Sequence, residues 1–161
     1  MMKKCAGFLI LPMLLIAACG EDEGSAPSVG EQKRNGSDLI ETTAEASELP
    51  EFLEHTSENI PETYADAVNN KELLTSIPCY CGCGESAGHE SAFDCFIDQM
   101  DDGAEVVWSD HGMKCGVCLE IVDASVKMKE DGASDKEIRT AVDDYYSEGF
   151  AEPTPTPHPD H

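Results

Sequence analysis

The amino-acid sequence predicts a small all-α, cysteine-rich domain over residues 48–150, ending in a helical hairpin. Several stretches place apolar residues at the spacing of one helical face, whereas only residues 106–108 have the character of a strand. A lone strand has no neighbour to share its backbone hydrogen bonds, so this run does not change the predicted class.

The first two predicted helices lie in the N-terminal half of this domain. One begins at Pro61, because a first helical turn leaves backbone N–H groups unpaired and proline has none. Its apolar residues are Tyr64, Ala65 and Val68. A second helical pattern covers residues 93–100 and consists of Phe93, Phe96, Ile97 and Met100.

The last two predicted helices form an antiparallel hairpin joined at residues 131–133. The earlier one runs from about Cys115 to Glu130 and ends before Gly132, a residue type that commonly terminates helices. The final helix begins at a capping box, in which Ser134 and Glu137 satisfy each other's backbone N–H groups. Its apolar face consists of Ile138, Ala141, Val142 and Tyr145.

The N-terminus has the pattern of an export signal. Lys3 and Lys4 precede a weakly polar to apolar stretch over residues 7–18, which is too short to span a bilayer. The stretch ends in Ile-Ala-Ala-Cys at residues 16–19, which resembles the bacterial lipobox. We therefore expect residues 1–18 to be a signal peptide and Cys19 to carry lipid, anchoring the protein to the outer face of the cell membrane.

Two segments flank the predicted domain. Residues 19–47 are acidic and poor in apolar side chains, so we expect a disordered tether that follows the lipidated Cys19. Residues 151–161 are rich in proline and histidine, which predicts an extended tail, because proline blocks both helix and central strand.

The charge of the chain limits its partners. The 161 residues include 33 acidic and 10 basic side chains, for a net charge of -23. Such a chain has no basic surface for phosphates, so we expect no nucleic acid as a partner. We expect instead a metal ion or a protein of the cell envelope, besides the membrane that holds the lipid anchor.

The most specific pattern is Pro-Cys-Tyr-Cys-Gly-Cys at residues 78–83. It contains Cys79, Cys81 and Cys83, and it is followed by Cys95 and by the pair Cys115 and Cys118. The sequence here resembles a family of bacterial proteins, largely lipoproteins, that is named for its PCYCGC motif. The resemblance covers about residues 48–150 and implies an exported, lipid-anchored protein, but no particular reaction.

The chemistry of the six cysteines allows two main interpretations. Soft thiolates select copper(I) or zinc, and glycines within the motif let the loop fold around an ion. One version of this site uses Cys79, Cys81, Cys83 and Cys95 as a tetrahedral set. Candidate additional ligands are His89, His111 and Met113. Alternatively, three disulfides staple the loop to two helices, and the domain is an interaction module without metal.

A third interpretation is thiol–disulfide exchange through Cys115 and Cys118. This pair opens a predicted helix, and the N-terminus of a helix lowers the pKa of a thiol. The predicted helices provide no parallel sheet of the thioredoxin kind, and Leu119 replaces the histidine that haem attachment needs. No catalytic constellation is recognisable, so we expect a binding protein and not an enzyme.

Overall fold

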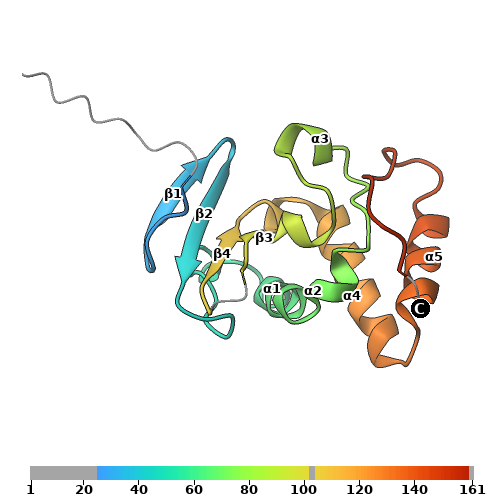
Figure 1. The fold of residues 1–161 in the computed structure, drawn as a ribbon, viewed down its shortest axis with the longest axis horizontal. Helices are drawn as coiled ribbons and strands as arrows, with labels where there is room; N and C mark the ends of the chain where they lie inside the picture. Colours follow the sequence, from blue (N-terminus) through green and yellow to red (C-terminus); the bar gives the residue numbers. More distant parts are fainter. Residues whose placement is uncertain (1–24, 102–103, 160–161) are drawn as a thin grey trace, which may run out of the picture.

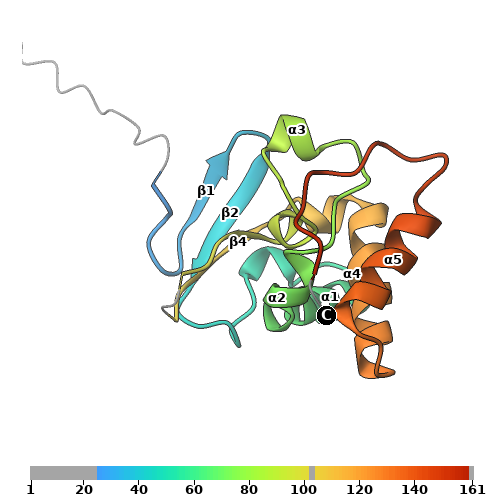
Figure 2. The ribbon, with the colours of Figure 1, turned by 45° about the vertical axis from the view of Figure 1, so that its right-hand side comes forward.

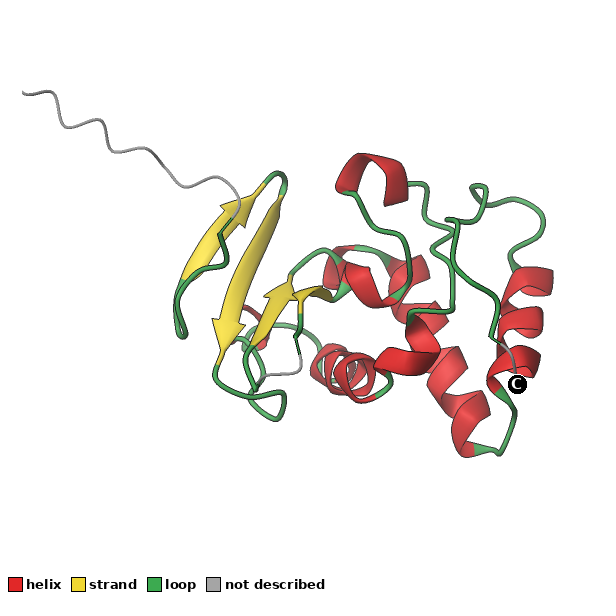
Figure 3. Ribbon diagram, in the orientation of Figure 1, coloured by secondary structure: helices red, strands yellow, loops and turns green. Residues whose placement is uncertain are grey.

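The structure is a computed structural model that describes residues 25–101 and 104–159, and it has a mixed α/β fold (Figures 1 and 3). A four-stranded sheet packs beside a group of helices, so the prediction of an all-α domain is wrong. The predicted signal peptide and Cys19 lie outside the described residues.

All four strands of the sheet pair antiparallel, in the order β1-β2-β4-β3. The strands are β1 (Gln32–Asn35), β2 (Asp38–Thr43), β3 (Ile97–Gln99) and β4 (Val106–Ser109). The run at 106–108 is therefore the body of β4, a central strand with β2 on one side and β3 on the other. Strands from the two halves of the chain thus complete one sheet.

The all-α prediction failed first in the segment expected to be a disordered tether, which contains β1 and β2. The two strands form a hairpin with a two-residue loop, Gly36 and Ser37, and Gly36 has φ 59°, which glycine adopts without strain. The polar composition of β2 does not suggest a buried strand. It can nevertheless be buried, because its polar groups form hydrogen bonds within the protein. The buried Glu41 carboxylate, for example, accepts backbone hydrogen bonds from Glu51 at 2.7 Å and Phe52 at 3.4 Å.

The helix predicted over residues 93–100 is also wrong. This stretch forms a short 3-10 helix, η2 (Phe93–Cys95), and then strand β3. The apolar spacing fits a helix, but β3 gains backbone hydrogen bonds from β4, with Ile97 opposite Trp108. Tertiary pairing here outweighs the local pattern.

The three other predicted helices are present. Pro61 lies in the first turn of α1 (Asn59–Asn69), and the predicted hairpin is α4 (Gly116–Glu130) and α5 (Asp135–Tyr145), with both capping-box hydrogen bonds present. The short helices are α2 (Lys71–Leu74), α3 (Gly84–Ala87), η1 (Glu51–Leu53) and η3 (Gly112–Lys114). Within the described ranges, no helix has both the length and the apolar character needed to cross a membrane.

An aromatic core joins the sheet to the helices. Tyr64 of α1 packs edge-on against Phe96 and at a tilt against Trp108, and its ring is fully buried. Its hydroxyl donates to the Ser109 carbonyl at 2.7 Å and accepts from the backbone N–H of Met113 at 3.2 Å. Tyr64 therefore fixes the segment that leads from β4 through η3 into α4.

The C-terminal tail is extended, as the sequence predicts, but it packs against the PCYCGC loop (Figure 2). Thr154 donates its backbone N–H to the Cys79 carbonyl at 3.2 Å, and its hydroxyl accepts from the Cys79 backbone at 2.8 Å. A Cβ at Gly84 would lie 2.5 Å from Thr154 Cγ2, so glycine allows this close approach. The folded unit thus extends beyond both predicted domain boundaries, 48 and 150.

Candidate metal centre

The six cysteines after residue 78 come from three separate segments and meet in one place. Cys79, Cys81 and Cys83 lie on the loop between α2 and α3, Cys95 ends η2, and the last two flank the start of α4. The Cys79 sulfur is 3.0 Å from that of Cys81 and 3.8 Å from that of Cys95. The Cys95 sulfur is 3.4 Å from that of Cys118. All six are thiols in the structure.

Three of these sulfurs lie close enough together to share one ion, and a fourth adjoins them. Zinc binds sulfur at about 2.3 Å, so two sulfurs on the same ion lie about 3.8 Å apart. The Cys79, Cys95 and Cys118 sulfurs all lie within 4.8 Å of one another. Cys81 adjoins this group through its 3.0 Å contact with Cys79. The group contains Cys118, whereas the set expected from the sequence contains Cys83.

The centre has a buried inner part and a partly exposed outer part. Cys95, Cys118 and Cys79 are 0%, 1% and 2% exposed, respectively. Cys81, Cys83 and Cys115 are partly exposed. Solvent therefore reaches the outer thiols but not the inner three.

Hydrogen bonds among the thiols lower the pKa of three of them and raise the pKa of two. The bond from Cys118 is the main cause that lowers the pKa of Cys95 to about 6, and bonds with Cys118 also lower the pKa of Cys79 and Cys81. The pKa of Cys118 itself is raised, because it holds its proton between these partners. The bond with Cys81 raises the pKa of Cys83 to about 12.

This pattern bears on the redox interpretation. Cys118 stands in the first turn of α4, where the sequence predicts a thiol with a lowered pKa, yet its pKa is raised. The acidic thiols lie instead on the PCYCGC loop and at Cys95. The lowered pKa values thus belong to Cys79, Cys81 and Cys95 and not to Cys118.

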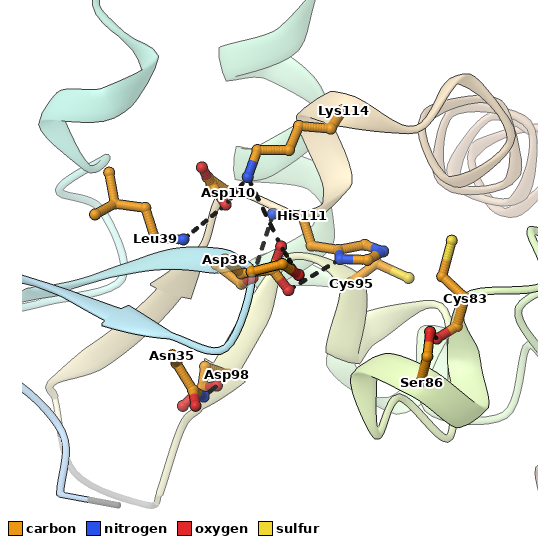
Figure 4. Close-up of polar contacts among 12 residues, drawn as sticks. Asn35, Asp38, Leu39, Cys83, Ser86, Cys95, Asp98, Asp110, His111 and Lys114 are labelled. Carbon is orange, nitrogen blue, oxygen red and sulfur yellow. Dashed lines mark hydrogen bonds and ion pairs between the residues drawn. The ribbon is translucent and has the colours of Figure 1, made fainter. Parts of the chain in front are cut away.

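His111 borders the sulfurs and is held by the sheet. Its Nδ1 lies 3.0 Å from the Asp38 carboxylate, and its pKa is raised chiefly by a hydrogen bond with Cys81 and further by Asp38. Its ligand nitrogen lies within 4.8 Å of the sulfurs of Cys81 and Cys83. Figure 4 shows the ring nitrogen that does not contact Asp38 pointing toward Cys83. A carboxylate behind a histidine in this way orients a metal ligand.

Asp38 was not among the expected site residues, because it lies in the segment expected to be a tether. Its carboxylate is also 3.7 Å from the Lys114 ammonium, which forms a 2.6 Å ion pair with the buried Asp110. Asp110 in turn accepts from the backbone N–H of Leu39 at 2.9 Å. The contacts connect β2 to the residues between β4 and α4 (Figure 4). The glycine turn at Gly36 is the one local signal that could have revealed the hairpin and its aspartate.

The other two candidate ligands are His89, which lies beside His111, and Met113, which packs against the core. The His89 ring meets His111 edge-on at 4.4 Å between centroids, and burial lowers its pKa. Its Nδ1 is buried and has no hydrogen-bond partner among the described residues. His89 thus lies beside His111, within 4.8 Å of it and of Asp38. Met113 packs partly buried against the hydrophobic core.

Comparison with known proteins agrees with the motif. The model of one family, described as "Protein of unknown function with PCYCGC motif", matches residues 8–159. No curated protein and no solved structure matches the chain. Since the match spans nearly the whole sequence, the chain belongs to the PCYCGC family.

Proposed function

We propose that the protein binds a soft metal ion, copper(I) or zinc, at the outer face of the cell membrane. The observation that carries this proposal is the convergence of six cysteines from three segments, with neighbouring sulfurs 3.0 to 3.8 Å apart from Cys81 through Cys79 and Cys95 to Cys118. These spacings resemble those of thiolates that share one ion.

The donor types favour soft metals. Thiolates select copper(I), zinc or iron–sulfur clusters, whereas calcium and magnesium prefer oxygen donors. The sulfurs are joined by one imidazole, His111, which Asp38 orients. This donor set suits copper(I) and zinc, both of which accept sulfur and nitrogen together.

The proposal that the protein is exported rests on its N-terminal sequence. The charged and then apolar segment, and the small residues before Cys19, support lipidation of that cysteine. Labelled fatty acid should enter the wild-type chain and should be absent from Cys19→Ala. Incorporation into both would remove the support for a lipid anchor, and so would incorporation into neither.

Metal analysis tests the proposed function directly. The processed chain, purified anaerobically under mild reduction, should contain near-stoichiometric copper or zinc. A Cys79→Ser/Cys95→Ser double variant should lose most of this metal, because both residues belong to the buried part of the cluster. Met113→Leu is the matched control and should keep its metal, since Met113 packs against the core.

The test also distinguishes the disulfide interpretation, because one thiol cannot both bind a metal ion and form a disulfide. A metal-free chain lacking six protons under non-reducing conditions would favour the stapled interaction module over metal binding. Circular dichroism of each variant shows whether a loss of metal reflects the site or the fold.

A further inference from the structure

We infer that the centre holds copper(I) as a cluster of several ions, with Cys81 and Cys118 as bridging thiolates. This inference rests on the proposed function and specifies its ligand. Its basis is that the thiols, together with His111, form three overlapping groups of three, each group with all its ligand atoms within 4.8 Å of one another. A fourth group, Asp38, His89 and His111, contains no thiol.

The first group is the buried one, Cys79, Cys95 and Cys118. The second consists of Cys81, Cys115 and Cys118, and the third of Cys81, Cys83 and His111. Copper(I) is satisfied by two or three soft ligands, so each group is a complete ligand set for one ion. Zinc requires four ligands, so no single group would complete its coordination.

Two residues connect the groups. Cys118 belongs to the first and second groups, and Cys81 belongs to the second and third. A thiolate has several lone pairs and can bind two copper(I) ions at once. The arrangement therefore forms a chain of adjoining sites that runs from the buried Cys95 to the partly exposed Cys83.

The surroundings offset the negative charge that six thiolates would bring. The backbone N–H of Cys83 donates to the Cys81 sulfur at 3.3 Å, at one of the two bridging positions. Cys115 is the N-cap residue of α4, and Cys118 lies in the first turn of this helix. The positive end of the helix dipole is thus directed toward the other bridging position.

Copper(I) titration of the reduced, metal-free chain tests this inference. Without oxygen, native mass spectrometry should show about three copper(I) ions per chain at saturation, one for each group. The loaded protein should also give the red luminescence of polynuclear copper(I) thiolates. Saturation at one ion would overturn the inference and leave the proposed function intact, whereas no uptake of copper or zinc would overturn both.

A pair of single variants tests the bridging role. Cys81 and Cys83 are both partly exposed and two residues apart, but Cys81 belongs to two groups and Cys83 to one. Cys83→Ser should therefore reduce the bound copper(I) by about one ion and Cys81→Ser by about two. Equal losses from the two variants would contradict a bridging Cys81. Far-ultraviolet circular dichroism should show the same fold for both.

Discussion

At the scale of single residues, His111 is the link between the sulfur centre and the sheet. Its ring is placed by Asp38 of β2 on one side and borders Cys81 on the other. The ion pair between Lys114 and Asp110 lies behind this contact, and Asp110 is anchored to the backbone of Leu39. The orientation of one candidate ligand therefore depends on a strand that lies far from the cysteines in sequence.

The first prediction concerns this orienting carboxylate. Asp38→Asn should weaken metal binding by about 10-fold to 100-fold, the range found for residues that hold a metal-bound histidine. The amide keeps the shape of the side chain but loses the charge that fixes the imidazole. Competition with a chelator of known affinity measures the change.

Asp98→Asn is the matched control. Asp98 is an exposed aspartate of β3, and its carboxylate accepts a hydrogen bond from the Asn35 side-chain amide at 2.9 Å (Figure 4). Asp98→Asn removes the same charge from the same sheet as Asp38→Asn, and its affinity for the metal should stay at the wild-type level. An equal loss in both variants would mean that overall charge, and not orientation of His111, determines the affinity.

At the scale of elements, α5 holds the loop and the tail together. Arg139 is buried and its Nη1 donates to the Ser76 carbonyl at 2.7 Å and to the Thr156 hydroxyl at 2.8 Å. Its Nε lies 2.8 Å from the Asp143 carboxylate. The residues just before the PCYCGC motif and the tail that covers it are thus fixed by one helix.

The second prediction concerns the start of α5. Ser134→Ala should lower the free energy of unfolding by about 1 kcal/mol, the usual effect of losing an N-cap residue. The hydroxyl accepts from the backbone N–H of Glu137 at 3.3 Å, and the Glu137 carboxylate accepts from the backbone N–H of Ser134 at 2.9 Å. Urea unfolding of the reduced, metal-free protein measures the difference.

The pH dependence of this difference follows from the same contact. Hydrogen bonds with Ser134 lower the pKa of Glu137 below its ordinary 4.5. A carboxyl whose pKa is lower in the folded state stabilises the fold above its ordinary pKa, and this contribution is lost as the pH falls through the folded value. The gap between wild type and Ser134→Ala should therefore shrink below about pH 4.5. Of the two hydrogen bonds that the Glu137 carboxylate accepts from Ser134, Ser134→Ala removes only the one from the hydroxyl and keeps the one from the backbone N–H. A gap that is constant from neutral to acidic pH would therefore show that the hydroxyl–carboxylate hydrogen bond does not contribute.

At the scale of the whole molecule, both ends of the described chain close around the cysteine centre. The N-terminal hairpin supplies Asp38 beside His111, and the C-terminal tail covers the PCYCGC loop (Figures 1 and 2). The tail also donates the Ala151 N–H to the Tyr80 carbonyl at 3.3 Å. Segments that the sequence marks as flanks are therefore part of the wall of the site.

The third prediction tests this role of the tail. A chain that ends at Phe150 should lose the hydrogen bonds to Cys79 and Tyr80, so the thiols of the loop should react faster with a maleimide. We expect an acceleration of about 10-fold for the buried Cys79, the effect of removing about 1.4 kcal/mol of opening free energy. Mass spectrometry of labelled peptides gives the rate for each cysteine.

A chain that ends at Pro157 is the control. It keeps Thr154 and Thr156, which make the contacts with the loop and with Arg139, and it removes only the residues beyond them. Its labelling rates should match those of the full chain. If both truncations label at the rate of the full chain, the tail does not protect the thiols.

Much of the site could be predicted from the sequence, because its residues carry their own signals. The PCYCGC motif, the later cysteines and the nearby histidines mark the centre, and the structure brings the six sulfurs and His111 together. The choice of Cys118 over Cys83 for the buried set could not be predicted. Spacing along the chain does not show which side of a loop faces the core.

The helices α1, α4 and α5 could likewise be predicted, because apolar periodicity, a proline in a first turn and a capping box act within a few residues. The sheet could not. Trp108 Nε1 donates to Thr43 Oγ1 at 2.8 Å across a separation of 65 residues, and no local pattern encodes such a contact.

The sequence by itself thus determined which side chains the protein has for chemistry and where its regular helices lie, since both depend on neighbouring residues. The tertiary structure decided that β2 and β4 pair, that Asp38 orients His111, and that the tail covers the loop. These contacts join residues that are distant in the chain, and their free energy comes from hydrogen bonds and burial that exist only after folding.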